Sequence, residues 1–375
     1  MSKRALSVGI LTAGLSAGIL ATAISPAAAQ GNPVGGSGNG YYLTGAGNNT
    51  GQPVYAFAYG NPNDEVYFGN FAPEGTPVAG VYPAAEQVDE ALVRRGNSFI
   101  IRGTNDEIFV YGDKGDTILV GDWNGDGVDT LAVRRKNHYL IRNDLKTGYS
   151  TQDFHYGNDD DNVMVGNWDG AGGDINGDGD KTDTLAGSWA GTTITEATAT
   201  TDTLMVRRAN HFYVKNDLVT GDAEYHFYYG NSDDSYLAGD WAKAPVWATD
   251  VASTTGEGKD ESKQYAADNK TVVGPKVKTS GENSDGKDQL AIKRGNLYLF
   301  SDELSEVKPT SPSAPVGTLA TPQQAYFGEA SDVAFVAQRT WTYNDNSAVV
   351  GGKDFAAGDN ETLSGDGIGL RRVLG

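Results

Sequence analysis

One short segment recurs five times along this chain of 375 residues. The clearest copies are Asp-Thr-Leu-Ala-Val-Arg-Arg at 129–135, Asp-Thr-Leu-Met-Val-Arg-Arg at 202–208 and Asp-Gln-Leu-Ala-Ile-Lys-Arg at 288–294, and looser copies stand at 89–95 and 366–372. A unit that recurs in this way buries its apolar face against its neighbours. The repeat therefore restricts the fold to a ring or a stack of similar units.

Each unit holds four short runs of aromatic or β-branched residues, bounded by glycine, aspartate and asparagine. Such runs predict strands, and no helical period is found after the N-terminal segment. We expect an all-β fold: one β-propeller domain at 41–375, with five blades of four antiparallel strands. The units span about 41–95, 96–135, 136–208, 209–294 and 295–372. An open β-solenoid or two stacked sheets are the alternatives, because repeats do not prove ring closure.

Two acidic positions recur in the units. An aspartate follows four residues after the glycine that ends each aromatic run, at Asp64, Asp116, Asp161, Asp234 and Asp332. A second aspartate opens each copy of the recurring segment, as Asp129 does. Because this second aspartate persists in units that have lost the surrounding loop motif, we expect a structural role for it, either accepting turn amides or pairing with an arginine.

The N-terminus has the pattern of a secretory signal peptide at 1–29. Lys3 and Arg4 precede a long apolar run, and Ala27, Ala28 and Ala29 form a small-residue cleavage site. An uncleaved membrane anchor is the alternative, because the run is long enough to cross a bilayer. We expect a glycine-rich linker at 30–40, no membrane insertion of the mature chain, and a protein that is secreted or attached to the cell surface.

Charge and composition narrow the classes of partner. The formal net charge is -20, which argues against nucleic acid and against an anionic membrane surface because both would repel the chain. The chain has no cysteine, so disulfides and thiolate metal sites are excluded. Cations and neutral ligands fit this composition better.

Residues 121–131, Gly-Asp-Trp-Asn-Gly-Asp-Gly-Val-Asp-Thr-Leu, resemble the FG-GAP or VCBS-type propeller repeat, in particular the copies in secreted actinobacterial proteins. The motif is clear in the second unit, recognisable in the third and fourth, and weak in the first and fifth. The resemblance implies a β-propeller, an extracellular location, calcium in some loops, and adhesion or ligand binding more often than catalysis.

Two loops are candidate calcium sites. By the resemblance, the first would use the side chains of Asp122, Asn124, Asp126 and Thr130 and the carbonyl of Val128, although Thr130 stands where the family usually has a carboxylate. The second gathers four carboxylates and an amide, Asp174, Asn176, Asp178, Asp180 and Asp183, whose mutual repulsion a cation would relieve. The alternative for both is a solvated acidic turn.

Four long insertions separate the third and fourth strands of their units, at 72–88, 169–201, 242–287 and 340–365. In a closed propeller this position always opens on the same face, so we expect the insertions to crowd over one end of the ring. They carry the aromatic residues Trp189, Trp247, Trp341 and Tyr343, which beside Asp and Asn would suit a sugar site. The alternative is that these rings only hold each loop onto its blade.

The repeated tryptophans are expected in the core. They are Trp123, Trp168 and Trp241, with Phe71 in the equivalent place of the first unit and Arg339 in the fifth.

No constellation in the sequence indicates catalysis. The prominent acids are repeat positions, whereas a catalytic pair should belong to a single site. We therefore expect a non-catalytic binding or adhesion module at the cell envelope, whose partner is a polysaccharide or an envelope protein. A structural envelope scaffold and a glycan-active hydrolase are the alternatives, and the sequence leaves the oligomeric state open.

Overall fold

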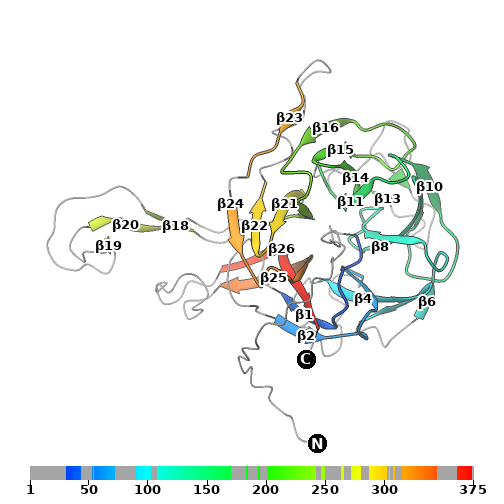
Figure 1. Cartoon of the computed structure of the whole chain (residues 1–375), viewed down its shortest axis with the longest axis horizontal. Helices are drawn as coiled ribbons and strands as arrows, with labels where there is room; N and C mark the ends of the chain where they lie inside the picture. Colours follow the sequence, from blue (N-terminus) through cyan, green and yellow to red (C-terminus); the bar gives the residue numbers. More distant parts are fainter. Residues whose placement is uncertain are drawn as a thin grey trace, which may run out of the picture.

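The computed structural model describes residues 31–43, 53, 55–71, 89–102, 108–169, 201–241, 287–301, 304, 307–308, 315–321, 323–343 and 361–373, with short strands at 183–184, 193–194, 246–249, 263–265 and 272–279. In this part of the chain, five small antiparallel sheets of four strands stand in a ring, which is the arrangement of a five-bladed β-propeller (Figure 1). The all-β prediction is confirmed.

In each blade the strands are given in order from the innermost to the outermost. Blade 1 is β3 (Glu65–Gly69), β4 (Glu90–Arg95), β5 (Ser98–Ile101) and β6 (Ile108–Val110); blade 2 is β7 (Thr117–Gly121), β8 (Thr130–Arg135), β9 (His138–Arg142) and β10 (Gln152–His155). Blade 3 is β11 (Asn162–Gly166), β14 (Thr203–Arg208), β15 (His211–Lys215) and β16 (Tyr225–Tyr228); blade 4 is β17 (Ser235–Gly239), β21 (Gln289–Arg294), β22 (Leu297–Phe300) and β24 (Gln323–Tyr326). Blade 5 is β25 (Val333–Tyr343), β26 (Glu361–Arg372), β1 (Gly40–Leu43) and β2 (Tyr55–Ala58).

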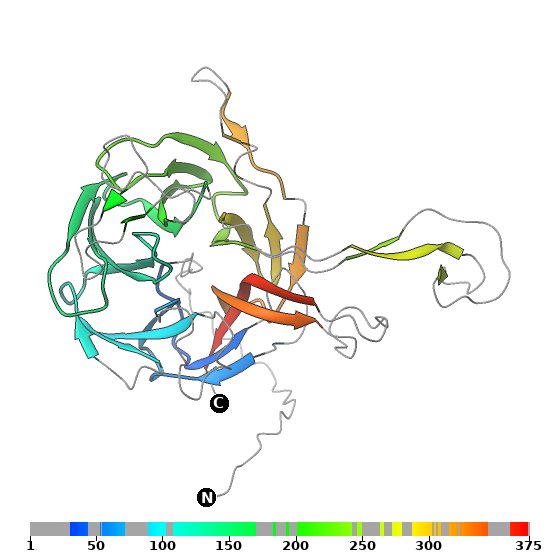
Figure 2. The ribbon, with the colours of Figure 1, turned by 180° about the vertical axis from the view of Figure 1, so that it is seen from behind.

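The ring is closed. Each of the innermost strands β3, β7, β11, β17 and β25 contacts the next, and β25 contacts β3 again. The last blade joins the two ends of the chain, because β1 pairs antiparallel with β26 in a register that sets Gly40 opposite Arg372. The red β26 lies beside the blue β1 in both views (Figures 1 and 2). The open solenoid is therefore not the fold.

The sequence units and the blades are out of phase by two strands. Blade 1 takes β3 and β4 from the first unit but β5 and β6 from the second, and the same holds around the ring. The first two strands of the chain complete the blade that the last two begin. Each repeat thus contributes to two blades, which ties neighbouring blades together covalently.

The core consists of apolar layers between neighbouring blades. One layer joins Trp123 and Tyr139 of blade 2 to Val165 and Leu204 of blade 3. Outer strands such as β9 alternate buried and part-exposed residues, because successive side chains point to opposite faces of the strand and only one face packs into the apolar layer. The repeated tryptophans are buried as predicted: Trp123, Trp168 and Trp241 are 0%, 3% and 7% exposed, and Phe71 is 3% exposed.

The glycine-rich segment at 31–38, which was expected as a linker, is hydrogen-bonded to the blades. It runs along the axis against the innermost strands: the Val34 amide donates to the Val66 carbonyl at 2.7 Å, and the Val120 amide donates to the Gly31 carbonyl at 2.8 Å. Asn32 also donates its side-chain amide to the Val163 carbonyl at 2.8 Å. We call residues 31–38 the axial segment. Its small residues let the backbone pass close to the blades, as Gly31 does, where a Cβ would lie 2.4 Å from the carbonyl oxygen of Val120.

Most of the insertions lie outside the described residues. In the described part of the insertion at 169–201, β12 (Asp183–Thr184) pairs with β13 (Thr193–Ile194). In that of the insertion at 242–287, β18 (Val246–Thr249), β20 (Val272–Thr279) and β19 (Lys263–Tyr265) form a small antiparallel sheet. This small sheet projects outward beside blade 4 (Figure 1), not over an end of the ring as expected for its insertion. In the described part of the chain, no helix has the length and apolar character that crossing a membrane requires.

Candidate binding site at one end of the ring

The two ends of the ring carry different acids. One end, which we call the arginine end, bears the Gly-x-x-x-Asp turns that precede each innermost strand. In each turn the aspartate is paired with the second basic residue of its own blade: Asp64 with Arg95, Asp116 with Arg135, Asp161 with Arg208, Asp234 with Arg294 and Asp332 with Arg372, at 2.5–2.7 Å. The turn begins at a glycine with positive φ, such as Gly157 at 70°.

The first basic residue of each pair reaches across to the turn of the next blade, where it donates to main-chain carbonyls. The links are Arg94 to Asp116 at 2.7 Å, Arg134 to Asp159 at 3.3 Å, Arg207 to Asp234 at 3.0 Å, Lys293 to Ala330 at 3.4 Å and Arg371 to Asp64 at 2.7 Å. The basic pairs therefore brace the ring, one residue within a blade and the other between blades.

The opposite end, which we call the insertion end, carries the aspartates that open each recurring segment. Four of them accept the main-chain amide of the neighbouring blade: Asp129 from Asn70, Asp202 from Asp122, Asp288 from Asn167 and Asp366 from Asp240, at 2.6–2.9 Å. The structural role predicted for Asp129 is confirmed, with an amide of the preceding blade as its donor. Because these residues flank the insertions, the insertions start and finish at this end.

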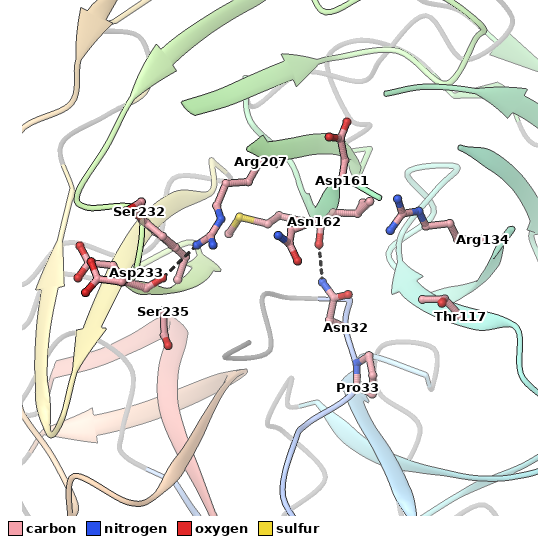
Figure 3. A pocket seen from close by; sticks show the side chains of 14 residues that line it. Asn32, Pro33, Thr117, Arg134, Asp161, Asn162, Arg207, Ser232, Asp233 and Ser235 are labelled. Atoms are coloured by element: carbon pink, nitrogen blue, oxygen red, sulfur yellow. Dashed lines mark hydrogen bonds between the residues drawn. The ribbon is translucent and has the colours of Figure 1, made fainter. Parts of the chain in front are cut away.

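A pocket of about 440 Å³ opens at the arginine end, between blades 2, 3 and 4 (Figure 3). Arg134 and Arg207 stand on opposite sides of it, and Asn32 of the axial segment lies between them. Val163 and Met164 of β11 add apolar wall, and the turn at 232–235 forms the rim on the side of blade 4. The pocket thus combines an apolar wall with several hydrogen-bonding groups.

The two arginines are held in place and still have donors to offer. The guanidinium of Arg207 lies over the Tyr236 ring, 4.5 Å from its centroid, and burial lowers the pKa of Arg207. Arg134 donates from Nε to the Lys136 carbonyl at 2.6 Å. A guanidinium has five N–H donors, and these contacts occupy only some of them within the described residues. Such a pair suits a ligand rich in oxygen acceptors.

Two of the three carboxylates that line the pocket, Asp161 and Asp234, are already bound by arginines. Burial raises the pKa of Asp161 and of Asp234, but the hydrogen bonds from Arg208 and Arg294 and those from the Asn158 and Asn231 amides outweigh it, so both pKa values are lowered. These carboxylates stay ionised at neutral pH and each is bound by an arginine. They are poorly suited to donate a proton.

The first candidate calcium loop is a hydrogen-bonded turn at the insertion end. Asp122 accepts the Gly127 amide at 2.8 Å, and Asp126 accepts both the Val128 amide and the Asn124 side-chain amide. Among the residues that the structure describes, Asn124 Oδ1 and Thr130 Oγ1 are buried and find no hydrogen-bond partner. Two orphaned oxygens at predicted ligand positions fit a hard cation, while the acceptors of Asp122 are partly used by amides, so calcium here stays a prediction.

Removal of Asp126 provides a test of that loop. If calcium binds there, millimolar calcium raises the melting temperature of the wild type. At a calcium concentration a hundred times the dissociation constant, the stabilisation is about 2.7 kcal/mol. Asp126→Ala should lose this rise, and the exposed control Asp160→Ala should keep it, as measured by thermal unfolding with calcium or a chelator. A rise that is unchanged in Asp126→Ala would remove this loop as the site.

The side chains of the remaining predicted site residues lie outside what the structure describes. The second acidic loop at 174–180 and Trp189 lie outside the described residues, and only the backbone of Asp183, Trp247, Trp341 and Tyr343 is described, in β12, β18 and β25. In the described part of the chain, no cluster of three acidic or histidine side chains forms a metal centre. The pocket residues Arg134 and Arg207 were absent from the predicted site, because the sequence shows them as two more copies of a repeat position.

No family model, no curated protein and no solved structure matches this chain. The resemblance to FG-GAP and VCBS repeats therefore stays a prediction, and the function rests on the site itself.

Proposed function

We propose that this protein is an exported, non-catalytic binding module of the FG-GAP or VCBS type at the cell envelope, and that it binds a polysaccharide at the arginine end. The pocket between Arg134 and Arg207 carries the proposal. A sugar offers hydroxyl groups to donors and C–H faces to apolar surface, and this pocket sets guanidinium groups beside Val163 and Met164.

Binding is favoured over hydrolysis by the state of the carboxylates. A glycoside hydrolase needs an acid whose pKa is raised and a second carboxylate free to act as base or nucleophile. At this pocket Asp161 and Asp234 have lowered pKa values and are held by arginines. The aspartates with raised pKa values, such as Asp288, lie at the insertion end and bind a main-chain amide of the preceding blade.

A substitution at the rim of the pocket tests this function. Ser232 is exposed on the rim, so Ser232→Trp should block the pocket without disturbing the core. We expect the mature chain to pellet saturably with isolated cell-wall polysaccharide, and Ser232→Trp to weaken this binding at least about tenfold, a change worth about 1.4 kcal/mol.

The chain offers a matched control for that variant. Ala330 occupies the same position of the corresponding turn in blade 5 and is not part of the pocket lining. Ala330→Trp should pellet like the wild type. Equal pelleting of Ser232→Trp and the wild type would refute the assignment of the pocket, and no pelleting of the wild type would refute the proposed ligand.

A further inference from the structure

A second cavity of about 440 Å³ lies between blades 1 and 2, at the outside of the ring. Val110 of β6 and Val133 and Leu140 of blade 2 contribute its apolar lining. Asp113 and Arg135 stand at its arginine end, joined by an ion pair of 2.6 Å, and the loop after β9 contributes Tyr149. We call this cavity the interblade groove.

The loop after β9 has a structural task that a second copy shares. It begins Asn-Asp-Leu-Lys-Thr-Gly, and the loop after β15 begins Asn-Asp-Leu-Val-Thr-Gly. Thr147 accepts the Val110 amide at 3.0 Å, and Thr220 accepts the His155 amide at the same distance. In both copies a threonine thus covers the outer strand of the preceding blade, which protects an otherwise open sheet edge.

The two copies differ where the interblade groove opens. In blade 3 the position of Leu140 is taken by Tyr213, whose ring lies under Arg208 at 4.5 Å and whose hydroxyl contacts His211 Nδ1 at 2.9 Å. A tyrosine therefore occupies in one blade the space that a leucine leaves open in the other. Arg135, the counterpart of Arg208, faces the open groove.

The second difference is an exposed aromatic ring. Tyr149 is 93% exposed and lines the interblade groove, whereas its counterpart in the loop of blade 3 is Asp222. A tyrosine that exposes nearly all of its surface contributes little to the folded core, although its ring presents a broad apolar face to a ligand. Folding alone gives no reason for a tyrosine here.

We infer that the interblade groove is a subsite for one pyranose ring of a neutral polysaccharide, with Tyr149 covering a C–H face and Asp113 and Arg135 bonding hydroxyl groups. This inference rests on the proposed function and adds a second site to it. A neutral sugar is favoured because the chain carries a net charge of -20 and Arg135 is already paired with Asp113 and Asp116. Two sites on one rigid ring would strengthen binding to a polymer without any new contact within either site.

Two variants test the subsite, each with a different mode of action. Tyr149→Ala removes the exposed ring, and Leu140→Tyr fills the groove with the residue that the chain itself uses in blade 3. Asp222→Ala, at the counterpart of Tyr149, is the control. The probes are neutral hexasaccharides of glucose, mannose and N-acetylglucosamine, measured by titration calorimetry on folded mature protein.

We expect at least one hexasaccharide to bind the wild type, with the dissociation constant raised about tenfold or more in Tyr149→Ala and Leu140→Tyr and unchanged in Asp222→Ala. Unchanged binding in both groove variants would overturn the subsite and leave the pocket between Arg134 and Arg207 as the proposed site. Pelleting with cell-wall polysaccharide but no binding of any hexasaccharide would overturn the neutral subsite alone. Failure in both assays would overturn the proposed function together with the subsite.

Discussion

Replacing Arg371 with methionine is expected to lower the free energy of unfolding by about 3–5 kcal/mol, because several hydrogen bonds from a charged donor are lost at about 1.5–3 kcal/mol each and the removal of a buried charge offsets part of that loss. Arg371 is 3% exposed and donates to the carbonyls of Gly38 at 2.6 Å, Val34 at 2.8 Å and Asp64 at 2.7 Å. Methionine keeps the apolar stem but leaves these buried acceptors without a donor. One side chain therefore joins the axial segment, blade 5 and blade 1.

The equivalent residue of blade 4 is a natural control. In the described part of the chain, Lys293 makes one side-chain hydrogen bond, to the Ala330 carbonyl at 3.4 Å, so Lys293→Met should cost about 1 kcal/mol or less. Urea unfolding followed by tryptophan fluorescence would measure both variants. Similar losses in the two would mean that Arg371 contributes no more than an ordinary bracing residue, and that the axial segment is not fastened through it.

The free energy of unfolding is expected to rise as the pH falls from about 8 to about 5, through the aspartates of the insertion end. Burial and then repulsion from Asp366 and Asp202 raise the pKa of Asp288 well above its usual range, and burial raises the pKa of Asp202 to about 6. A carboxyl with a raised pKa binds its proton more tightly in the folded state. Its contribution is fully present below the unfolded pKa of 3.8 and is lost as the pH rises through the folded value.

The acids of the arginine end have the opposite sign. Hydrogen bonds from Arg95 lower the pKa of Asp64, against the effect of burial, so its contribution is present above 3.8 and disappears as the pH falls below that value. The two groups together place the maximum of stability at about pH 4, because acids with raised pKa values lose their contribution as the pH rises above it and arginine-bound acids lose theirs as the pH falls below it.

Asp288→Asn separates the two effects. The asparagine oxygen still accepts the Asn167 amide but carries no charge. As the pH rises from about 5 to about 8, the free energy of unfolding should therefore fall less in the variant than in the wild type. The difference should be about 1.4 kcal/mol for every tenfold difference in proton affinity between the folded and unfolded carboxyl. Asp64→Asn should instead lower the free energy of unfolding at neutral pH and reduce its dependence on pH below about pH 4. Urea unfolding with a chelator present excludes metal effects. Wild-type stability that rises with pH over this interval would contradict the assignment.

Much of the fold follows from the repeat, because the repeat records how strands pack. The five copies of the Asp-to-Arg segment predicted the strand types, the blade number and the buried positions of Trp123, Trp168 and Trp241, which the structure confirms. The axial segment was missed because glycine and asparagine have no hydrophobic period. Most of its contacts use its backbone, to β3, to β7 and to the Arg371 side chain, and the sequence contains no pattern for them.

The candidate sites were less predictable for a related reason. A pocket arises where one copy of a repeat differs from another, as Leu140 differs from Tyr213, and the size of that difference depends on which side chains face each other across two blades. We expected binding residues on the insertions because the insertions vary in length. The interblade groove forms at a small difference between regular copies, and a repeat pattern contains only what the copies share.

The pairing of β1 with β26 also determines when the ring can form. Arg371 binds Gly38 across 333 residues, and Gly40 pairs with Arg372 at the far end of the chain. β1 must pair with β26, which is synthesised long after it, so blade 5 cannot assemble until residue 372 has been made. Contacts between such distant residues slow folding, because a long loop must close before they form. During that interval the edge of β1 that later pairs with β26 is open, and an open strand edge favours aggregation.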